Sequence, residues 1–228
     1  MHNIKAIAFD ADDTLWVNEP YFQETERKFC ALLEDYLPHH TISQELYKTE
    51  VQNMALYGYG VKAFMLSMVE TAVRVSGGTL KPGIIDKIIQ YGKEHLDKPI
   101  EMLDDVEDVL NSLNGKYRLV VATKGDLLDQ ERKLKKSMLE RFFHHTEIMS
   151  DKQEADYLKL IRHLDISPDQ FLMIGNSIKS DVLPVLAIGG HAIHIPYHIN
   201  WVHDQVDHTI NLPNFLQVER LGEILKYL

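Results

Sequence analysis

The chain has 228 residues and a formal net charge of −10; 45% of its residues are hydrophobic and 25% are charged. This composition is typical of a globular protein, and the excess of acid excludes a general affinity for nucleic acid, whose phosphates are bound by clustered Lys and Arg. No apolar run approaches the roughly 20 residues of a membrane span, and no secretory signal is recognisable. The only cysteine, Cys30, excludes an internal disulfide. We therefore expect a cytoplasmic protein that contacts no membrane.

Three carboxylates follow the first predicted strand. Ile4 to Phe9 is a short apolar run that fits a strand buried in a parallel sheet. Asp10, Asp12 and Asp13 come next, at the strand end where open α/β sheets bind ligands. Crowded carboxylates repel each other unless a cation neutralises them, and Mg²⁺, which also binds substrate phosphate, suits this task. One carboxylate could attack phosphorus while another transfers a proton; the alternative is a solvated turn in which Asp12 or Asp13 caps a helix.

The stretch 16–97 predicts helices rather than strands. Apolar residues recur at helical spacing in four segments, 21–37, 42–54, 61–75 and 84–95. The stretch is far longer than a crossover between two parallel strands requires. We therefore predict a helical cap domain at 16–97, inserted into a core formed by 1–15 and 98–228.

A cap of this kind would exclude water from the site and select the leaving group. Three of its residues lie in or beside a glycine-punctuated loop and are candidates to contact the organic part of a phosphate ester: Tyr57, Tyr59 and Lys62. The alternative is an ordinary turn between helices, with the tyrosines packed on the cap core.

The second predicted strand, Tyr117 to Thr123, is rich in β-branched residues and ends in a hydroxyl. The turn after it begins with Lys124 and Gly125. The Gly125 backbone amide could bind an anion, as exposed N–H groups of turns do, and Lys124 is a candidate phosphate contact by proximity. The alternative for Lys124 is a solvent-facing loop lysine. Residues 127–139 are interpreted as a charged surface helix.

Further strands are predicted at 146–149, 171–174 and 191–195, followed by an edge strand at 208–212 and a terminal helix at 216–228. Lys152 follows the first of them, and Asn176 and Asp181 follow the second. Several histidines lie late in the chain, but their spacing is irregular and no Cys joins them, which argues against a zinc site; they are His191, His194, His198, His203 and His208.

The order of these features resembles that of the haloacid dehalogenase-like hydrolases. Asp10-x-Asp12-x-Thr14 directly after an N-terminal strand is similar to the first motif of that superfamily. Its second, third and fourth motifs are matched in order by Thr123, by Lys152 and by Gly175-Asn176 with Asp181. The resemblance covers nearly the whole chain, and it implies a Rossmann-like α/β core with a parallel sheet, an inserted helical cap and a bound Mg²⁺.

The resemblance also implies a role for each matched residue. Asp10 is the nucleophile, and Asp12 is the general acid and base, with its backbone carbonyl on the metal. Thr123 hydrogen-bonds the transferring phosphoryl group, and Lys152 neutralises the nucleophile and the phosphate. At Asn176 an Asp is usual in the family; its amide oxygen can still bind Mg²⁺, but without charge, so Asp181 would matter more as a metal ligand, directly or through water.

These features predict a magnesium-dependent phosphatase that hydrolyses a small phosphorylated metabolite through an aspartyl-phosphate. A 2-haloacid dehalogenase would use the same nucleophile, but such enzymes generally do not have an acid two residues beyond it, so Asp12 favours phosphorus. A phosphomutase would pass the phosphate to a second hydroxyl. Asn176 motivates a further hypothesis, a binding or regulatory protein with weakened catalysis.

Overall fold

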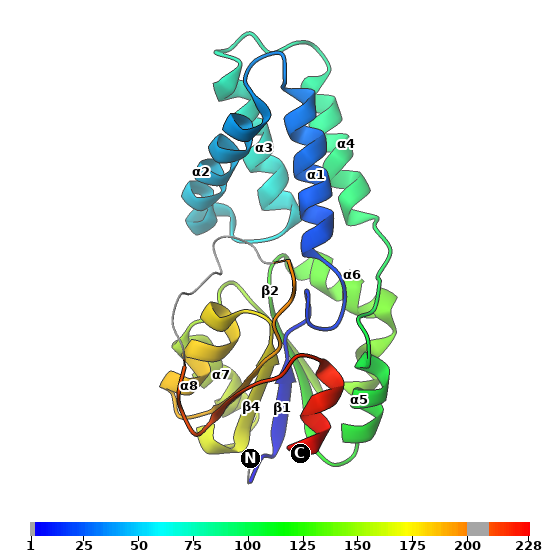
Figure 1. The fold of residues 1–228 in the computed structure, drawn as a ribbon, viewed down its shortest axis with the longest axis vertical. Helices are drawn as coiled ribbons and strands as arrows, with labels where there is room; N and C mark the ends of the chain where they lie inside the picture. The colour runs from blue at the N-terminus through cyan, green and yellow to red at the C-terminus, as the bar shows by residue number, and fades with distance from the viewer. Residues whose placement is uncertain (1–2, 200–209) are drawn as a thin grey trace. The chain divides into compact units, whose positions relative to one another are not determined.

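The computed structural model describes residues 3–199 and 210–228 (Figure 1). Its internal contacts divide the chain into two compact units. The first unit consists of Met1–Glu19, Ile100–Lys124 and Gln130–Leu228, and the second of Pro20–Pro99 and Gly125–Asp129. Trp16, the first residue of the predicted insertion, is 1% exposed and packs in the core of the first unit.

The first unit contains a six-stranded sheet in the order β3-β2-β1-β4-β5-β6, and every neighbouring pair is parallel. The strands are β1 (Ala6–Phe9), β2 (Arg118–Lys124), β3 (His145–Met149), β4 (Phe171–Gly175), β5 (His191–His194) and β6 (Phe215–Gln217). Helices α1 to α4 lie between β1 and β2 in the chain. The predicted fold class, a parallel-sheet α/β core with a helical insertion, is confirmed.

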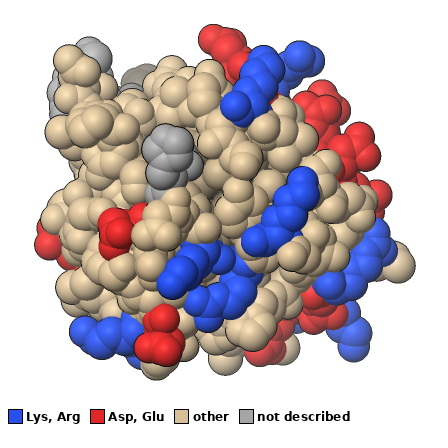
Figure 2. Space-filling view, turned by 90° about the horizontal axis from the view of Figure 1, so that it is seen from below, with Lys and Arg blue, Asp and Glu red and all other residues tan. Residues whose placement is uncertain are grey.

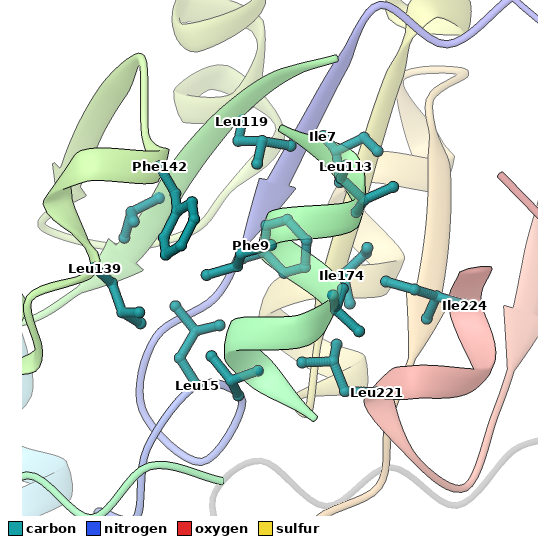
Figure 3. Close-up of a cluster of buried hydrophobic side chains, with 14 of the residues drawn as sticks. Ile7, Phe9, Leu15, Leu113, Leu119, Leu139, Phe142, Ile174, Leu221 and Ile224 are labelled. Atoms are coloured by element: carbon teal, nitrogen blue, oxygen red, sulfur yellow. The ribbon is translucent and has the colours of Figure 1, made fainter. Parts of the chain in front are cut away.

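Alternate residues of β1 pack on opposite faces of this sheet, as the two-residue repeat of a strand requires. Ile7 and Phe9 lie in a buried cluster with α5 (Val106–Leu113) and the 3₁₀ helix Leu221–Lys226 (Figure 3). Ala6 and Ala8 lie in a second cluster with α7 (Glu154–His163). Both faces of β1 are therefore covered, which explains why its sequence is apolar without alternation.

The register brings the ends of three strands to one edge of the sheet. Phe9 pairs with Val121 of β2 and with Ile174 of β4. Asp10, Thr123 and Asn176, which follow these paired residues by one or two positions, therefore lie near the same edge. After β4 the chain forms a π-helical turn, Ile178–Val182, that leads into α8 (Leu183–Ala187).

The second unit is built from α1 (Glu19–Leu32), α2 (His39–Tyr57), α3 (Val61–Val75) and α4 (Ile84–Leu96), close to the four predicted helices. Their apolar faces meet in a cluster that includes Phe29, Leu46, Met68 and Ile88. Pro38 directly precedes α2, and Gly83, at φ 82°, precedes α4 in a left-handed conformation that glycine adopts without strain.

Two predictions near the C-terminus are wrong. Of the predicted edge strand 208–212, the described residues 210–212 are not in a strand. The edge strand is β6, and it occupies the start of the predicted terminal helix, of which the 3₁₀ helix Leu221–Lys226 is the helical remainder. Phe215–Gln217 pairs with β5, a long-range contact that helical periodicity in the sequence does not reveal. Trp201, His203 and His208 lie outside the described residues.

Cys30 is fully buried in the second unit, and burial raises the pKa of its thiol to about 12. Because the thiolate is the reactive form, we expect iodoacetamide at about pH 8 to leave the native protein unmodified and to add one group after unfolding in urea. Intact mass spectrometry measures this directly. Equal rates of modification in the native and unfolded protein would contradict the burial of Cys30.

On the face of the molecule shown in Figure 2, both basic and acidic side chains are present, and uncharged residues cover much of the surface. Across the described ranges, no helix combines the length and the apolar character needed to cross a bilayer.

Candidate active site

The centre of the site is a buried lysine between two aspartates. Lys152 is 2% exposed, and its Nζ lies 2.5 Å from Asp10 Oδ1 and 2.6 Å from Asp181 Oδ1. Asp10 follows β1, Lys152 follows β3, and Asp181 lies in the π-helical turn after β4. Three segments that are distant in sequence thus supply one ion-pair network, which the sheet topology brings together.

The glycine before Asn176 is required by this network. A Cβ atom added to Gly175 would lie 2.2 Å from Asp181 Oδ2, far inside van der Waals contact. The same Oδ2 accepts a hydrogen bond from Ser177 N at 3.0 Å. The backbone of Gly175 therefore leaves the space in which the Asp181 carboxylate turns toward Lys152.

Burial and neighbouring charges shift the pKa values of this network. The pKa of Asp10 is raised to about 7, because burial and the nearby Asp181 carboxylate together outweigh Lys152, which lowers it. Burial alone would lower the pKa of Lys152, but Asp10 and Asp181 outweigh this and hold it above its ordinary value. Lys152 therefore stays charged, and it is the neighbour that favours the ionised form of Asp10.

Beside this network, the Asp10 carboxylate, the Asp12 carbonyl and the Asn176 amide lie close together. The Asn176 amide lies 3.3 Å from both Asp10 Oδ2 and the Asp12 backbone oxygen. If the amide nitrogen of Asn176 faces these two oxygens, it donates a hydrogen bond to each of them. If the amide oxygen faces them, three oxygen atoms face one another. Carboxylate, carbonyl and amide oxygens are ligands that Mg²⁺ prefers, so these residues fit the ion. The described residues contain no group of three or more His, Cys, Asp or Glu side chains that could hold a metal by themselves.

Asp12 is held by three side chains. Lys133 Nζ lies 2.6 Å from Asp12 Oδ1 and 2.8 Å from Oδ2. Trp16 Nε1 donates to Oδ1 at 2.7 Å, and Gln130 Nε2 donates to Oδ2 at 2.8 Å. Burial alone would raise the pKa of Asp12, but Lys133 and these hydrogen bonds outweigh it and lower the pKa.

The interpretation of 127–139 as a charged surface helix is therefore wrong for one of its faces. The helix is α6 (Leu127–Ser137), and Gln130 and Leu134, at 4% and 5% exposure, point inward together with the partly buried Lys133. Spacings of three and four residues placed these positions on one helix face, which is the signal that could have found them.

Comparison with known proteins assigns the chain to a family. The model of the haloacid dehalogenase-like hydrolases matches residues 4–189. The chain belongs to this family. It is therefore a hydrolase of the haloacid dehalogenase-like (HAD) type.

Individual relatives agree with this assignment. The crystal structure of a HAD-like family hydrolase from Xanthomonas campestris has a TM-score of 0.85 at 35% identity, over 95% of this chain and 87% of that one. The magnesium-bound structure of YfnB from Bacillus subtilis, with a TM-score of 0.65 at 16% identity over 99% of this chain and 98% of that one, shows the shared fold alone. The glyceraldehyde 3-phosphate phosphatase of Methanopyrus kandleri is 23% identical over 186 residues, 78% of each chain.

In this HAD hydrolase the Thr of the first motif contacts Asp10. Thr14 is 4% exposed, and its hydroxyl lies 3.2 Å from Asp10 Oδ2 and 3.3 Å from Asn176 Oδ1. The sequence contained this signal within the motif Asp10-x-Asp12-x-Thr14, but Thr14 was not among the predicted site residues. Its hydroxyl can donate to Asp10 and so favours the ionised carboxylate.

Asp13 is a structural residue. It has a φ of 59°, and its carboxylate accepts hydrogen bonds from Asn18 N at 2.8 Å and Glu19 N at 2.9 Å, at the start of α1. Burial raises the pKa of Asp13 to about 8, although these two amides lower it. Of the two residues for which helix capping is the alternative, Asp13 accepts from backbone amides at the start of α1, while Asp12 makes side-chain contacts.

The residues predicted to contact phosphate occupy different surroundings. Thr123 is 2% exposed, and its hydroxyl donates to Lys124 O at 3.5 Å, the outer limit of a hydrogen bond. Lys124 Nζ lies 3.0 Å from Ser180 Oγ, next to Asp181 in the chain. Gly125, at φ 135°, belongs to the short segment that groups with the helical unit.

The three candidate specificity residues lie within the helical unit. Tyr57 is 44% exposed, and its hydroxyl donates to Glu70 Oε1 at 3.1 Å. Lys62 Nζ pairs with Asp126 at 2.9 Å, and Tyr59 is half-buried. Tyr57 and Lys62 are thus held by carboxylates of the same unit.

Proposed function

We propose that this HAD hydrolase is a magnesium-dependent phosphatase that hydrolyses a small-molecule phosphate monoester through an aspartyl-phosphate on Asp10. The observation that carries the proposal is the buried Asp10 carboxylate paired with Lys152 at 2.5 Å, with the Asp12 carboxylate two residues on. The phosphatase activity named for the Methanopyrus kandleri relative supports phosphorus rather than carbon as the centre attacked.

The first chemical step uses Asp10 as the nucleophile. One of its oxygens forms a bond to phosphorus while the bond from phosphorus to the ester oxygen breaks. Asp12 supplies a proton to the leaving alkoxide, which requires that substrate binding weaken the Lys133 contact that lowers the pKa of Asp12 in the resting protein. Lys152 stabilises the charge that gathers around the phosphoryl group, while the Thr14 hydroxyl orients the nucleophile. We assign Thr123, Lys124, Gly125 and Lys152 to binding of the phosphoryl oxygens.

The second step reverses the roles of the aspartates. Asp12 removes a proton from water, the water oxygen bonds to phosphorus, and the bond between phosphorus and Asp10 breaks, releasing phosphate and the free carboxylate. The resting protein is thereby restored.

We assign the Mg²⁺ ion to Asp10, the Asp12 carbonyl and Asn176. Bound there, it would supply positive charge for the phosphate and for the crowded carboxylates. We assign Asp181 to contact the ion through water, because its own oxygens accept from Lys152 and Ser177. Choice among leaving groups is assigned to the helical unit, with Tyr57, Tyr59 and Lys62 as the residues to test.

The experiment that tests this function measures phosphate release by the purified protein from p-nitrophenyl phosphate and from a panel of phosphorylated metabolites. We expect turnover that excess chelator abolishes and added Mg²⁺ restores. Undiminished turnover in chelator would contradict the metal assignment. Halide release from 2-haloacids without phosphate release would identify a dehalogenase. Transfer of the phosphoryl group to a second hydroxyl would identify a phosphomutase. Binding of a phosphate analogue without turnover would identify a protein that has lost catalysis.

Asn176→Asp tests the metal assignment without relying on turnover. The new carboxylate would face Asp10 and the Asp12 carbonyl, so Mg²⁺ affinity should rise by about tenfold or more, equivalent to about 1.4 kcal/mol. Without the ion, added repulsion should lower the melting temperature, and saturating Mg²⁺ should restore it. Calorimetric titration of Mg²⁺ into both proteins measures this; equal affinities would place Asn176 outside the coordination shell.

A further inference from the structure

Lys133 is attached to the proposed general acid and base. Besides its two contacts with the Asp12 carboxylate, at 2.6 and 2.8 Å, its Nζ lies 3.2 Å from Asn18 Oδ1. An ammonium group has three donors, and all three acceptors found here belong to the first unit. The Lys133 side chain is 16% exposed, so its charge is directed into the protein rather than into solvent.

Two neutral donors, together with Lys133, restrict the orientation of the Asp12 carboxylate. Gln130 Nε2 donates to Asp12 Oδ2 at 2.8 Å and to Lys124 O at 3.1 Å, and two acceptors on one nitrogen fix the orientation of the amide. Trp16, which is 1% exposed, donates its indole N–H to the opposite oxygen, Oδ1. Each Asp12 oxygen thus receives one neutral donor and one contact from Lys133.

An ordinary surface ion pair does not explain this arrangement. Exposed pairs involve flexible side chains and contribute little, whereas this lysine is partly buried and shares its carboxylate with a buried indole and a buried amide. Lys135 and Lys136, on the same helix, are exposed. Lys133 is therefore more buried than these neighbours on α6.

We propose that Lys133 is a positioning residue for Asp12: in the resting protein it holds the carboxylate in place beside Asp10, and one of the four contacts opens when Asp12 exchanges a proton with the leaving group. The inference rests on the proposed phosphatase function and extends it to a residue outside the four motifs. Proton transfer requires the carboxyl group to lie within about 2.6–3.2 Å of the leaving oxygen, and a displacement of about 1 Å can cost roughly 100-fold in rate. Loss of Lys133 should therefore act chiefly through Asp12.

The kinetic test compares two substrates that differ in the basicity of the leaving group, p-nitrophenyl phosphate and phenyl phosphate. Lys133→Met should lower kcat by about 100-fold on phenyl phosphate, which needs a proton, and by less than about threefold on p-nitrophenyl phosphate, with KM unchanged. Asp12→Asn should show the same dependence on the leaving group, and Lys133→Arg should recover part of the loss. Lys135→Met, the matched control, should behave as wild type.

A spectroscopic test follows the same contact without substrate. The indole N–H of Trp16, assigned with the help of Trp201→Phe, reports the position of Asp12 in a ¹H–¹⁵N correlation spectrum. Lys133→Met, and Lys133→Gln as a second variant, should shift this signal, whereas Lys135→Met should not. Melting temperatures of all variants establish that they are folded.

The outcomes separate this inference from the proposed function. Equal losses on both substrates, a raised KM alone, or wild-type behaviour of Lys133→Met would each overturn the positioning role. If the wild type hydrolyses no ester, the phosphatase function fails, and the Trp16 signal still decides whether Lys133 holds Asp12. An unchanged Trp16 signal in both Lys133 variants would overturn the proposed contact itself.

Discussion

Replacement of Asp10 by Asn is expected to lower phosphatase turnover by more than about 1,000-fold while the protein stays folded. The amide of Asn cannot attack phosphorus, so no aspartyl-phosphate forms. The fold should survive because Asp10 follows β1 and lies outside the hydrophobic clusters. Lys152 would keep Asp181 as a charged partner.

Steady-state kinetics with saturating Mg²⁺ measures this loss, and a melting curve accompanies it. Because burial already raises the pKa of Asp10 to about 7, removing its charge carries little cost, and the melting temperature should stay within about 5 °C of wild type. Asp104→Asn, at an exposed position, is the matched control and should retain full turnover. Near-normal turnover of Asp10→Asn would remove Asp10 from the role of nucleophile.

Replacement of Lys152 by Met is expected to abolish turnover and also to lower the free energy of unfolding by about 3–5 kcal/mol. Without the ammonium group, Asp10 and Asp181 would be two buried carboxylates that repel each other. Urea unfolding in the presence of chelator isolates this effect from that of the metal.

A second substitution tests the physical cause. Asp181→Asn removes one of the two unpaired charges, so Lys152→Met with Asp181→Asn should recover part of the lost stability but no turnover. Lys159→Met, at a position whose side chain is 59% exposed, is the matched control and should change stability by less than about 0.5 kcal/mol. A loss below about 1 kcal/mol for Lys152→Met would contradict the buried network.

The pH dependence of this loss has a defined sign. In Lys152→Met the folded-state pKa of Asp10 should rise further above its unfolded value, because the group that lowers it is gone. A carboxyl group whose pKa is raised by folding destabilises the folded state at every pH above its unfolded pKa of 3.8. This destabilisation grows with pH until the pH exceeds the folded-state pKa. The deficit should therefore be larger at about pH 8 than at about pH 5, where the folded protein can retain the proton.

The sequence alone determined which residues follow strand ends and so gather at the proposed site. An apolar run followed at once by Asp10 and Asp12 predicts a strand end bearing charge, and Lys152 and Asn176 likewise follow predicted strands. Because every strand of a parallel sheet points the same way, its strand ends meet at one edge, and local pattern is enough to place these residues there. The helical insertion was predictable for a related reason, since its periodicity and length are local properties.

Tertiary structure alone decided which of these side chains contact each other. Lys133 and Gln130 meet Asp12 from positions more than 100 residues away. Helical spacing groups these two residues on one face, but it does not reveal that this face meets Asp12. Asp181 pairs with Lys152 because Gly175 leaves room for its carboxylate. Such contacts depend on how a helix or turn packs against the sheet edge, and this packing is fixed by burial across distant segments rather than by local sequence.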